Sequence, residues 1–327
     1  MPRRTIPLER PFDVLATLGP LRRGTGDPTI RLAAGAFERA AMTPDGPATI
    51  SLRVVGGEVR AEAWGDGADR VLEALPAFLG LDDDDQGFEP ARHPVVADLA
   101  RRRGAVRLGR TGAVLDVLVP AILEQRITGT EAWRGYRRLV LAHGGPAPGP
   151  TRLRIAPRAE VLAGLPSWSW PQLGIEPRRG ALLRRVARDA DRLERLAEPA
   201  RGAGHGGAGA AALAERLRGY TGIGPWTAAE VTLRALGDPD AVSVGDAHLS
   251  HVVAWSLAGE PRATDERMLE LLEPWRGHRA RVIRLLESSG RMPPRFGPRI
   301  APRDLTELSP RSTRRFPVAG YRGRDGR

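Results

Sequence analysis

The 327-residue chain contains no cysteine and no lysine, so all 50 of its basic side chains are arginines. Without cysteine it forms no disulfide, thiolate zinc site or iron–sulfur cluster. Without lysine it lacks the amine that a Schiff base, a P-loop or a pyridoxal-phosphate anchor requires. It also lacks an apolar run of the roughly 18 residues that a transmembrane helix needs.

The first residues, Met1–Arg4, lead directly into mixed polar sequence without the apolar core of a signal peptide. We therefore expect a cytoplasmic protein, associated with a bacterial nucleoid, with no membrane contact. The net charge of +11 indicates a polyanionic partner. Residues 291–327, however, hold ten arginines and three acidic residues and so supply +7 of the +11. Charge alone therefore leaves nucleic-acid binding an open question.

The pattern of apolar residues predicts an α+β protein that is mostly α. Residues 1–88 are expected to form a small N-terminal α+β domain with an antiparallel sheet, because period-two alternation runs through 29–34, 48–55 and 58–64. Gly56-Gly57 predicts a two-residue hairpin turn between the last two strands. A helix is predicted over 68–79. The four aspartates at 82–85 are interpreted as a solvated loop.

From residue 89 the chain shows helical periodicity, which predicts an all-α domain over 89–290. An Arg/Pro-rich tail over 291–327 is expected to be disordered or loosely docked. The predicted helices are 95–103, 113–125, 131–143, 158–163, 179–196, 208–218, 226–236, 247–257, 265–272 and 278–288.

The most informative motif is Gly222-Ile223-Gly224-Pro225, which separates two predicted helices. Two glycines allow a sharp turn and a close approach to a partner, and proline is well tolerated in the first helical turn. The free amides at the start of the second helix form a phosphate site, and Ile223 can pack back between the helices. Such a turn binds the backbone of a duplex and reads no sequence.

Asp246 follows Gly224 by 22 residues (246 − 224), with one helix and one loop between them. The chain can therefore fold back and place Asp246 beside the turn. An aspartate before a helix is also a common capping residue, so capping is the alternative interpretation.

The segment 216–249 resembles the helix-hairpin-helix DNA glycosylase superfamily, most closely the AlkA-type 3-methyladenine glycosylases (family II). The weaker resemblance extends over residues 5–290. It implies an all-α glycosylase domain with a cleft and makes Asp246 the catalytic residue. This chemistry is physically reasonable, because cleavage of an N-glycosidic bond builds positive charge on the sugar. A nearby carboxylate stabilises that charge and orients or deprotonates the attacking water.

In bifunctional relatives a lysine stands two residues after the second hairpin glycine, where this chain has Trp226. The resemblance therefore implies a monofunctional enzyme, a monomer acting on double-stranded DNA that contains a damaged base. It implies no cofactor beyond a structural Na⁺ or K⁺ on backbone carbonyls. The carbonyls in question are those of Arg218, Tyr220 and Ile223.

The target base must leave the duplex stack and enter a pocket. The resemblance places Trp226 and Trp275 in that pocket, and electron-rich rings suit a cationic alkylated base. Phe12 is a further candidate from the N-terminal domain. Glu230 departs from the aromatic residue of the family and leaves the substrate range open. Each tryptophan can equally be a core residue.

The remaining site residues are predicted to contact DNA. Arg126 occupies the slot of the intercalating wedge, and Gln125 is its neighbour facing the orphan strand. His248 is a candidate phosphate ligand, because the Asp-x-His pattern resembles the 8-oxoguanine glycosylases. The hairpin residues Gly222, Ile223, Gly224 and Thr227 complete the expected interface.

Three functions remain open on these residues. The first is a glycosylase for alkylated purines such as 3-methyladenine, and the second is a glycosylase for an oxidised or deaminated base. The third is a non-catalytic helix-hairpin-helix protein that binds DNA or senses lesions, which Asp246 argues against.

Overall fold

The computed structural model describes residues 1–103, 106–201 and 207–294. The predicted tail over 291–327 lies outside these ranges from residue 295 onward. Helix and strand both occur, in the α+β combination that the sequence predicts. Within the described residues, no helix combines the length and the apolar character needed to span a bilayer.

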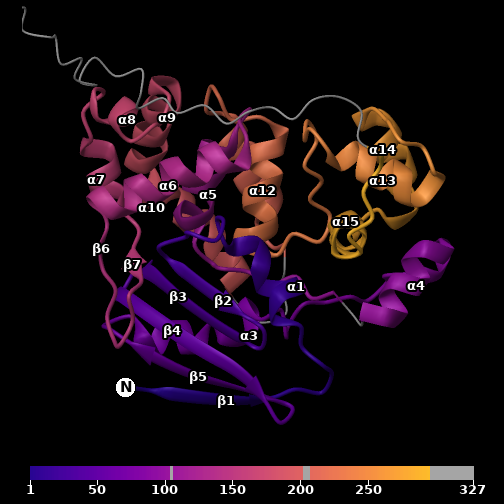
Figure 1. The fold of residues 1–327 in the computed structure, drawn as a ribbon, viewed down its shortest axis with the longest axis horizontal. Helices are drawn as coiled ribbons and strands as arrows, with labels where there is room; N and C mark the ends of the chain where they lie inside the picture. Colours follow the sequence, from indigo (N-terminus) through magenta and orange to yellow (C-terminus); the bar gives the residue numbers. More distant parts are fainter. Residues whose placement is uncertain (104–105, 202–206, 295–327) are drawn as a thin grey trace, which may run out of the picture.

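The N-terminal part forms a five-stranded antiparallel sheet in the order β1-β5-β4-β3-β2 (Figure 1). The Gly56-Gly57 turn is confirmed, because both glycines adopt positive φ (60° and 80°), as a primed hairpin turn requires. Two strands escaped the sequence prediction, β1 and β3, since both mix charged residues into a weak alternation. The strands are β1 (Arg3–Pro7), β2 (Ile30–Ala33), β3 (Ala36–Thr43), β4 (Gly46–Val55) and β5 (Glu58–Trp64).

Short helices pack on one face of this sheet and form the first hydrophobic core with it, around Phe37, Leu52 and Leu75. The single helix predicted over 68–79 is wrong, because the segment forms two helices. Pro76 has no N–H to continue the first of them and instead occupies the first turn of the second. The helices are α1 (Val14–Leu18), α2 (Ala68–Glu73) and α3 (Leu75–Phe78).

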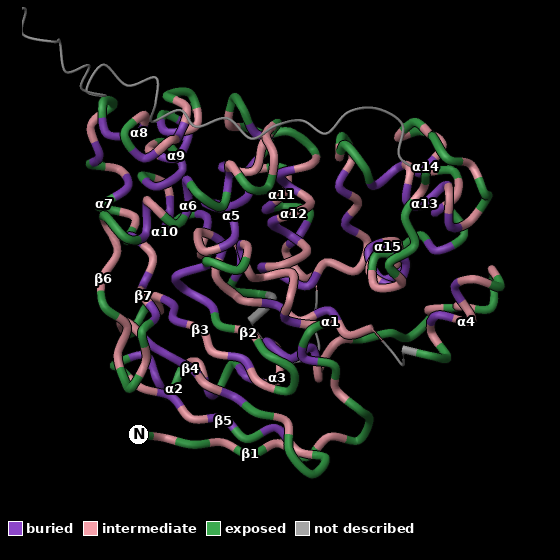
Figure 2. Tube along the Cα trace, viewed as in Figure 1, coloured by how far each residue is buried: buried purple, intermediate pink, exposed green. Residues whose placement is uncertain are grey.

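The region predicted as one all-α domain contains two hydrophobic cores. The first is formed by the middle of the chain, and its buried residues line the inner sides of the helices (Figure 2). A two-stranded hairpin, β6 (Gly145–Pro146) with β7 (Arg154–Ile155), interrupts it. The helices of this group are α5 (Val114–Glu124), α6 (Gly129–His143), α7 (Ala159–Gly164), α8 (Ser169–Gln172), α9 (Pro177–Arg188), α10 (Ala190–Ala197), α11 (Ala210–Arg218) and α12 (Pro225–Leu236).

The second helical core brings together helices from distant parts of the chain, and it lies to the right of α12 in Figure 1. Its members are α4 (Pro94–Arg103), α13 (Leu249–Ala258), α14 (Asp265–Leu272) and α15 (Arg279–Ser288). The segment 237–248 connects α12 of the first group to α13 of the second. Asp246 therefore lies on the connection between the two groups.

Two further expectations need correction. The helix predicted over 179–196 is divided at Asp189, where α9 ends; the Asp189 carboxylate accepts hydrogen bonds from Tyr220 and Arg216 of the neighbouring hairpin. The aspartates at 82–85 are not all solvated. Asp83 pairs with Arg281 at 2.6 Å, with only 6% and 2% of the two side chains exposed. A buried carboxylate needs such a partner to offset its desolvation.

Candidate active site

The helix-hairpin-helix turn is formed as the sequence predicts, with α11 ending at Arg218 and α12 beginning at Pro225. Gly222 has φ of 103°, a conformation that favours glycine. Ile223 is 6% exposed and packs into the first helical core, while Gly222 and Gly224 remain exposed. The turn thus exposes its backbone at the surface, and Ile223 anchors it by packing into the first helical core.

Gln125 and Thr227 hold the turn together, and their predicted contacts with DNA remain predictions. The Gln125 side-chain amide donates to the Gly222 carbonyl at 3.0 Å and to the Thr227 hydroxyl at 2.9 Å. Thr227 is only 2% exposed. Both side chains therefore connect the end of α5 to the hairpin, which makes them positioning residues for it.

Arg126 lies at an exposed corner between α5 and α6, beside Gln125. Its φ is 54°, and among the described residues it is the one non-glycine residue with positive φ. A side chain in this left-handed conformation is strained, and such strain persists where surrounding contacts impose it and is common at functional sites. The placement agrees with the predicted wedge position and does not by itself show its role.

Asp246 is fixed by hydrogen bonds from two directions. Its Oδ1 accepts from the amides of His248 (2.8 Å) and Leu249 (3.0 Å), and its Oδ2 accepts from the Trp226 Nε1–H at 3.0 Å. The carboxylate therefore caps α13, which begins at Leu249 and not at the predicted residue 247. It also binds the first turn of α12, immediately after the hairpin.

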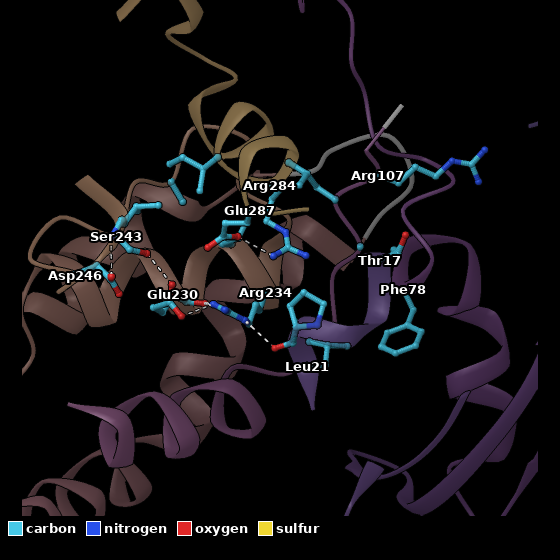
Figure 3. A pocket seen from close by; sticks show the side chains of 17 residues that line it. Thr17, Leu21, Phe78, Arg107, Glu230, Arg234, Ser243, Asp246, Arg284 and Glu287 are labelled. Atoms are coloured by element: carbon cyan, nitrogen blue, oxygen red, sulfur yellow. Dashed lines mark hydrogen bonds and ion pairs between the residues drawn. The ribbon is translucent and has the colours of Figure 1, made fainter. Parts of the chain in front are cut away.

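A pocket opens beside Asp246, where the sheet core and the two helical cores meet (Figure 3). The N-terminal part contributes Pro20, Leu21 and Phe78, and the segment leading to α13 contributes Ser243. The helical groups contribute Glu230, Leu233, Arg234, Leu249, Ile283, Arg284 and Glu287. The pocket thus exists only when the sheet and both helical groups are packed together.

Charged side chains form much of the pocket wall. Glu230 accepts from Arg234 at 2.5 Å and from the Ser243 hydroxyl at 2.7 Å, and Arg284 pairs with Glu287 at 3.0 Å (Figure 3). Burial lowers the pKa of Arg234, but surrounding carboxylates, first that of Glu230, more than offset this and leave its pKa raised. Burial lowers the pKa of Arg284. Arginine keeps its proton at neutral pH in any case, so the wall carries fixed charges.

Only one of the predicted pocket side chains, Glu230, lines this pocket. Trp226 is half-buried and directs its ring N–H at Asp246. Trp275 is 4% exposed, lies in the second helical core and donates to the Glu89 carbonyl at 2.9 Å, so it does not line this pocket. Phe12 packs on the sheet core and lies under the Arg107 guanidinium, which itself lines the pocket.

Several pocket residues were missed by the sequence analysis. Phe78 is the aromatic side chain of the wall, but its segment shows only an ordinary apolar pattern. The i,i+4 spacing of Glu230 and Arg234 and the i,i+3 spacing of Arg284 and Glu287 are visible in the sequence as helical ion pairs. Nothing in the sequence brings the two pairs to one pocket, because they belong to different cores.

Two predicted features remain predictions. The His248 side chain is exposed next to Asp246, a position open to a phosphate. Of the three carbonyls assigned to a monovalent cation, that of Tyr220 accepts a hydrogen bond from the Ile223 amide at 2.9 Å. Within the described ranges, no group of three or more histidine and acidic side chains is arranged to hold a metal ion.

Comparison with known proteins identifies the fold. No family model matches the chain, and no curated protein matches it in sequence. A 3-methyladenine DNA-glycosylase from Archaeoglobus fulgidus matches in structure with a TM-score of 0.71 at 18% identity, over 88% of this chain and 98% of that one. This chain has the fold of the helix-hairpin-helix DNA glycosylases.

A second solved structure shares this fold. An 8-oxoguanine glycosylase/lyase from Clostridium acetobutylicum, solved with double-stranded DNA containing cytosine opposite 8-oxoguanine, matches with a TM-score of 0.64 at 12% identity. The match covers 85% of this chain and 92% of that one. Both matches span the sheet and the helices, so the likeness includes the N-terminal part and not the hairpin alone.

Proposed function

We propose that this protein is a DNA glycosylase that uses Asp246 to hydrolyse the N-glycosidic bond of a damaged base. The observation that carries the proposal is the hydrogen bond between Trp226 and Asp246 at 3.0 Å. It couples the carboxylate at the pocket to the helix whose N-terminus forms the hairpin. A nucleotide held at the hairpin by its phosphate is thereby placed at a fixed distance from the acid.

The hairpin, the pocket and Asp246 each have a separate role in the proposed reaction. The exposed amides of the hairpin bind the backbone of the duplex, and the dipole of α12 favours the phosphate charge. The extruded base enters the pocket between the three cores. The Asp246 carboxylate then faces the sugar carbon, stabilises the positive charge that develops there and directs a water molecule to it.

The absence of lysine supports a monofunctional enzyme. Strand cleavage by β-elimination in this superfamily starts from an amine that forms a Schiff base with the sugar. No lysine occurs anywhere in the chain, and the hairpin position itself is Trp226. We therefore expect base release without strand cleavage.

An alkylated purine is the first candidate for the released base. The fold shared with the 3-methyladenine enzyme of Archaeoglobus fulgidus supports it. The pocket wall supports a second candidate, a neutral oxidised or deaminated base. Its single aromatic side chain, Phe78, offers little cation–π attraction to a charged purine, whereas the pairs Arg234–Glu230 and Arg284–Glu287 offer donors and acceptors to a polar base edge.

A panel of duplexes tests the proposal and separates the candidates. Each duplex carries one lesion, either a methylated purine, 8-oxoguanine, hypoxanthine or uracil, and each reaction is analysed with and without hot alkali. We expect strand breaks for at least one lesion only after alkali, because the abasic product is alkali-labile. Breaks without alkali would contradict the monofunctional mechanism, and the absence of base release from the whole panel would contradict the proposed function.

A further inference from the structure

Helix α9 presents a row of arginines to solvent on one face. Arg178, Arg185 and Arg188 are exposed, and Ala181 lies between them on the same side of the helix. At 100° per residue these four positions fall within an arc of about 80°, and the row extends about 15 Å along the helix axis. None of the exposed positions in this arc is acidic, so the face carries concentrated positive charge.

The same helix packs directly against the elements expected to meet DNA. The Arg185 guanidinium donates to the Thr221 carbonyl of the hairpin at 2.6 Å, and Arg179 donates to the Gln125 carbonyl beside Arg126. A Cβ built on Gly222 would lie 3.3 Å from Leu182 Cδ2, so α9 touches the hairpin backbone itself. The arginine face is therefore continuous with the hairpin surface.

Two of these arginines have no anionic partner in the described part of the protein. The side chains of Arg178 and Arg188 form no ion pair or hydrogen bond there, whereas Arg179 pairs with Glu176 and Arg216 with Asp189. Unpaired guanidinium groups in a row are suited to a partner that offers regularly spaced negative charge. Duplex DNA presents one negative charge per about 1.7 Å of its axis.

We propose that the arginine face of α9 binds phosphates of duplex DNA next to those held by the hairpin, extending the contact along the backbone. The inference rests on the proposed function, since it requires that the hairpin side of the protein meets DNA. Ala181 leaves room in the middle of the row, so the sugar–phosphate backbone can approach the helix while the flanking guanidinium groups reach phosphate oxygens. Contacts of this type add affinity and carry no sequence information.

The test compares two double variants of the full-length protein. Arg178→Ala/Arg188→Ala removes two charges from the α9 face and leaves Arg185, which bonds the hairpin, in place. Arg53→Ala/Arg60→Ala removes two exposed charges from β4 and β5, which lie on the sheet away from α9 (Figure 1). The dissociation constant of an undamaged duplex is measured over a series of salt concentrations, and circular dichroism checks the fold.

Each phosphate contact contributes about 0.9 to the slope of log K against log salt concentration. We therefore expect the α9 variant to lose about 1.8 from the wild-type slope, while the sheet variant keeps it. Base release by the sheet variant should be unchanged, since Arg53 and Arg60 belong neither to the pocket nor to the α9 face. An unchanged slope in the α9 variant beside a salt-dependent wild type overturns this inference alone, and a wild type that binds no duplex overturns the proposed function as well.

Discussion

The Asp246 carboxylate both binds the amides at the start of α13 and lines the pocket, so the capping interpretation and the proposed catalytic role are compatible in one side chain. One oxygen accepts the two amides at the start of the helix, and the other accepts the Trp226 N–H. Three N–H donors stabilise negative charge on the carboxylate and restrict its rotation. An acid held in this way is aligned before the substrate arrives, which is the usual requirement for electrostatic catalysis.

Replacing Trp226 with phenylalanine tests the contribution of this hydrogen bond. The ring remains but the N–H donor is lost, and a hydrogen bond to a charged group contributes about 1.5–3 kcal/mol. We expect single-turnover base release to slow by about 10- to 100-fold, with duplex affinity unchanged. Trp133→Phe is the matched control, because it removes a similar N–H bond to Glu124 outside the pocket. Equal rates in wild type and Trp226→Phe would show that Asp246 needs no alignment by Trp226.

The sequence predicted the hairpin turn itself best, because its glycines and proline are local signals. The bonds of Asp246 to the start of α13 were also within reach, since an aspartate before a helix is a local capping pattern, whereas its catalytic role comes from the family resemblance and remains a proposal. The contacts of Trp226 and Trp275 could not be predicted, since an indole fits a core and a pocket equally well until its surroundings are known. The bond of Gln125 to Gly222 was missed because it joins residues 97 positions apart.

At the scale of elements, the hairpin depends on one glycine for its shape and on another for its accessibility. Gly222 has φ of 103°, and an added Cβ would approach Leu182. Gly224 has φ of −100°, and an added Cβ there would meet nothing within 4 Å. Substitutions at Gly222 and Gly224 therefore test the folding of the turn and its approach to phosphate separately.

Alanine at each position gives different expected results. Gly222→Ala should lower the free energy of unfolding by at least about 1 kcal/mol, because alanine resists the left-handed region, and should weaken binding to all duplexes alike. Gly224→Ala should weaken binding in the same way with a smaller loss of stability, since its methyl group faces the DNA side only. Chemical denaturation and duplex titration measure both. A Gly222→Ala protein as stable as the wild type would contradict the assigned conformation.

The helices were predictable wherever apolar spacing and a local stop signal coincide, as in α5, α6 and α12. The predicted boundaries were wrong where contacts with residues distant in sequence determine where a helix ends. The division between α9 and α10 occurs at Asp189, whose carboxylate is held by Arg216 and Tyr220 from another helix. The sequence did not predict strand β1, because its place in the sheet depends on pairing with β5, more than 50 residues away in sequence.

At the scale of the whole molecule, the pocket depends on how the three cores are joined. Arg281 at the start of α15 forms its buried pair with Asp83, on the segment that leaves the sheet domain, and Arg39 of β3 pairs with Asp116 of α5 at 2.8 Å. The Asp83–Arg281 pair links the sheet side to the second helical group, and the Arg39–Asp116 pair links the sheet to the first. Composition and periodicity do not reveal such links, because the sequence shows only an aspartate run and scattered arginines.

Neighbouring aspartates allow this link to be tested. Asp83→Asn leaves the Arg281 charge buried without its counter-charge, which should lower the free energy of unfolding by about 3–5 kcal/mol. Asp84 is exposed and its side chain accepts only the Gln86 amide, so Asp84→Asn should change stability by less than about 0.5 kcal/mol. Urea denaturation measures both, and equal stabilities would show that the Asp83–Arg281 pair does not hold α15 against the segment that follows the sheet.

The most direct measurement for the proposed mechanism is single-turnover base release by Asp246→Asn from the best substrate of the lesion panel, with duplex affinity measured in parallel. Asparagine caps a helix about as well as aspartate, so α13 and the fold should persist. We expect release to slow by at least about 100-fold, since the charge facing the sugar is gone, while affinity for the duplex stays the same or rises. Release at the wild-type rate would contradict the assignment of Asp246 as the catalytic carboxylate.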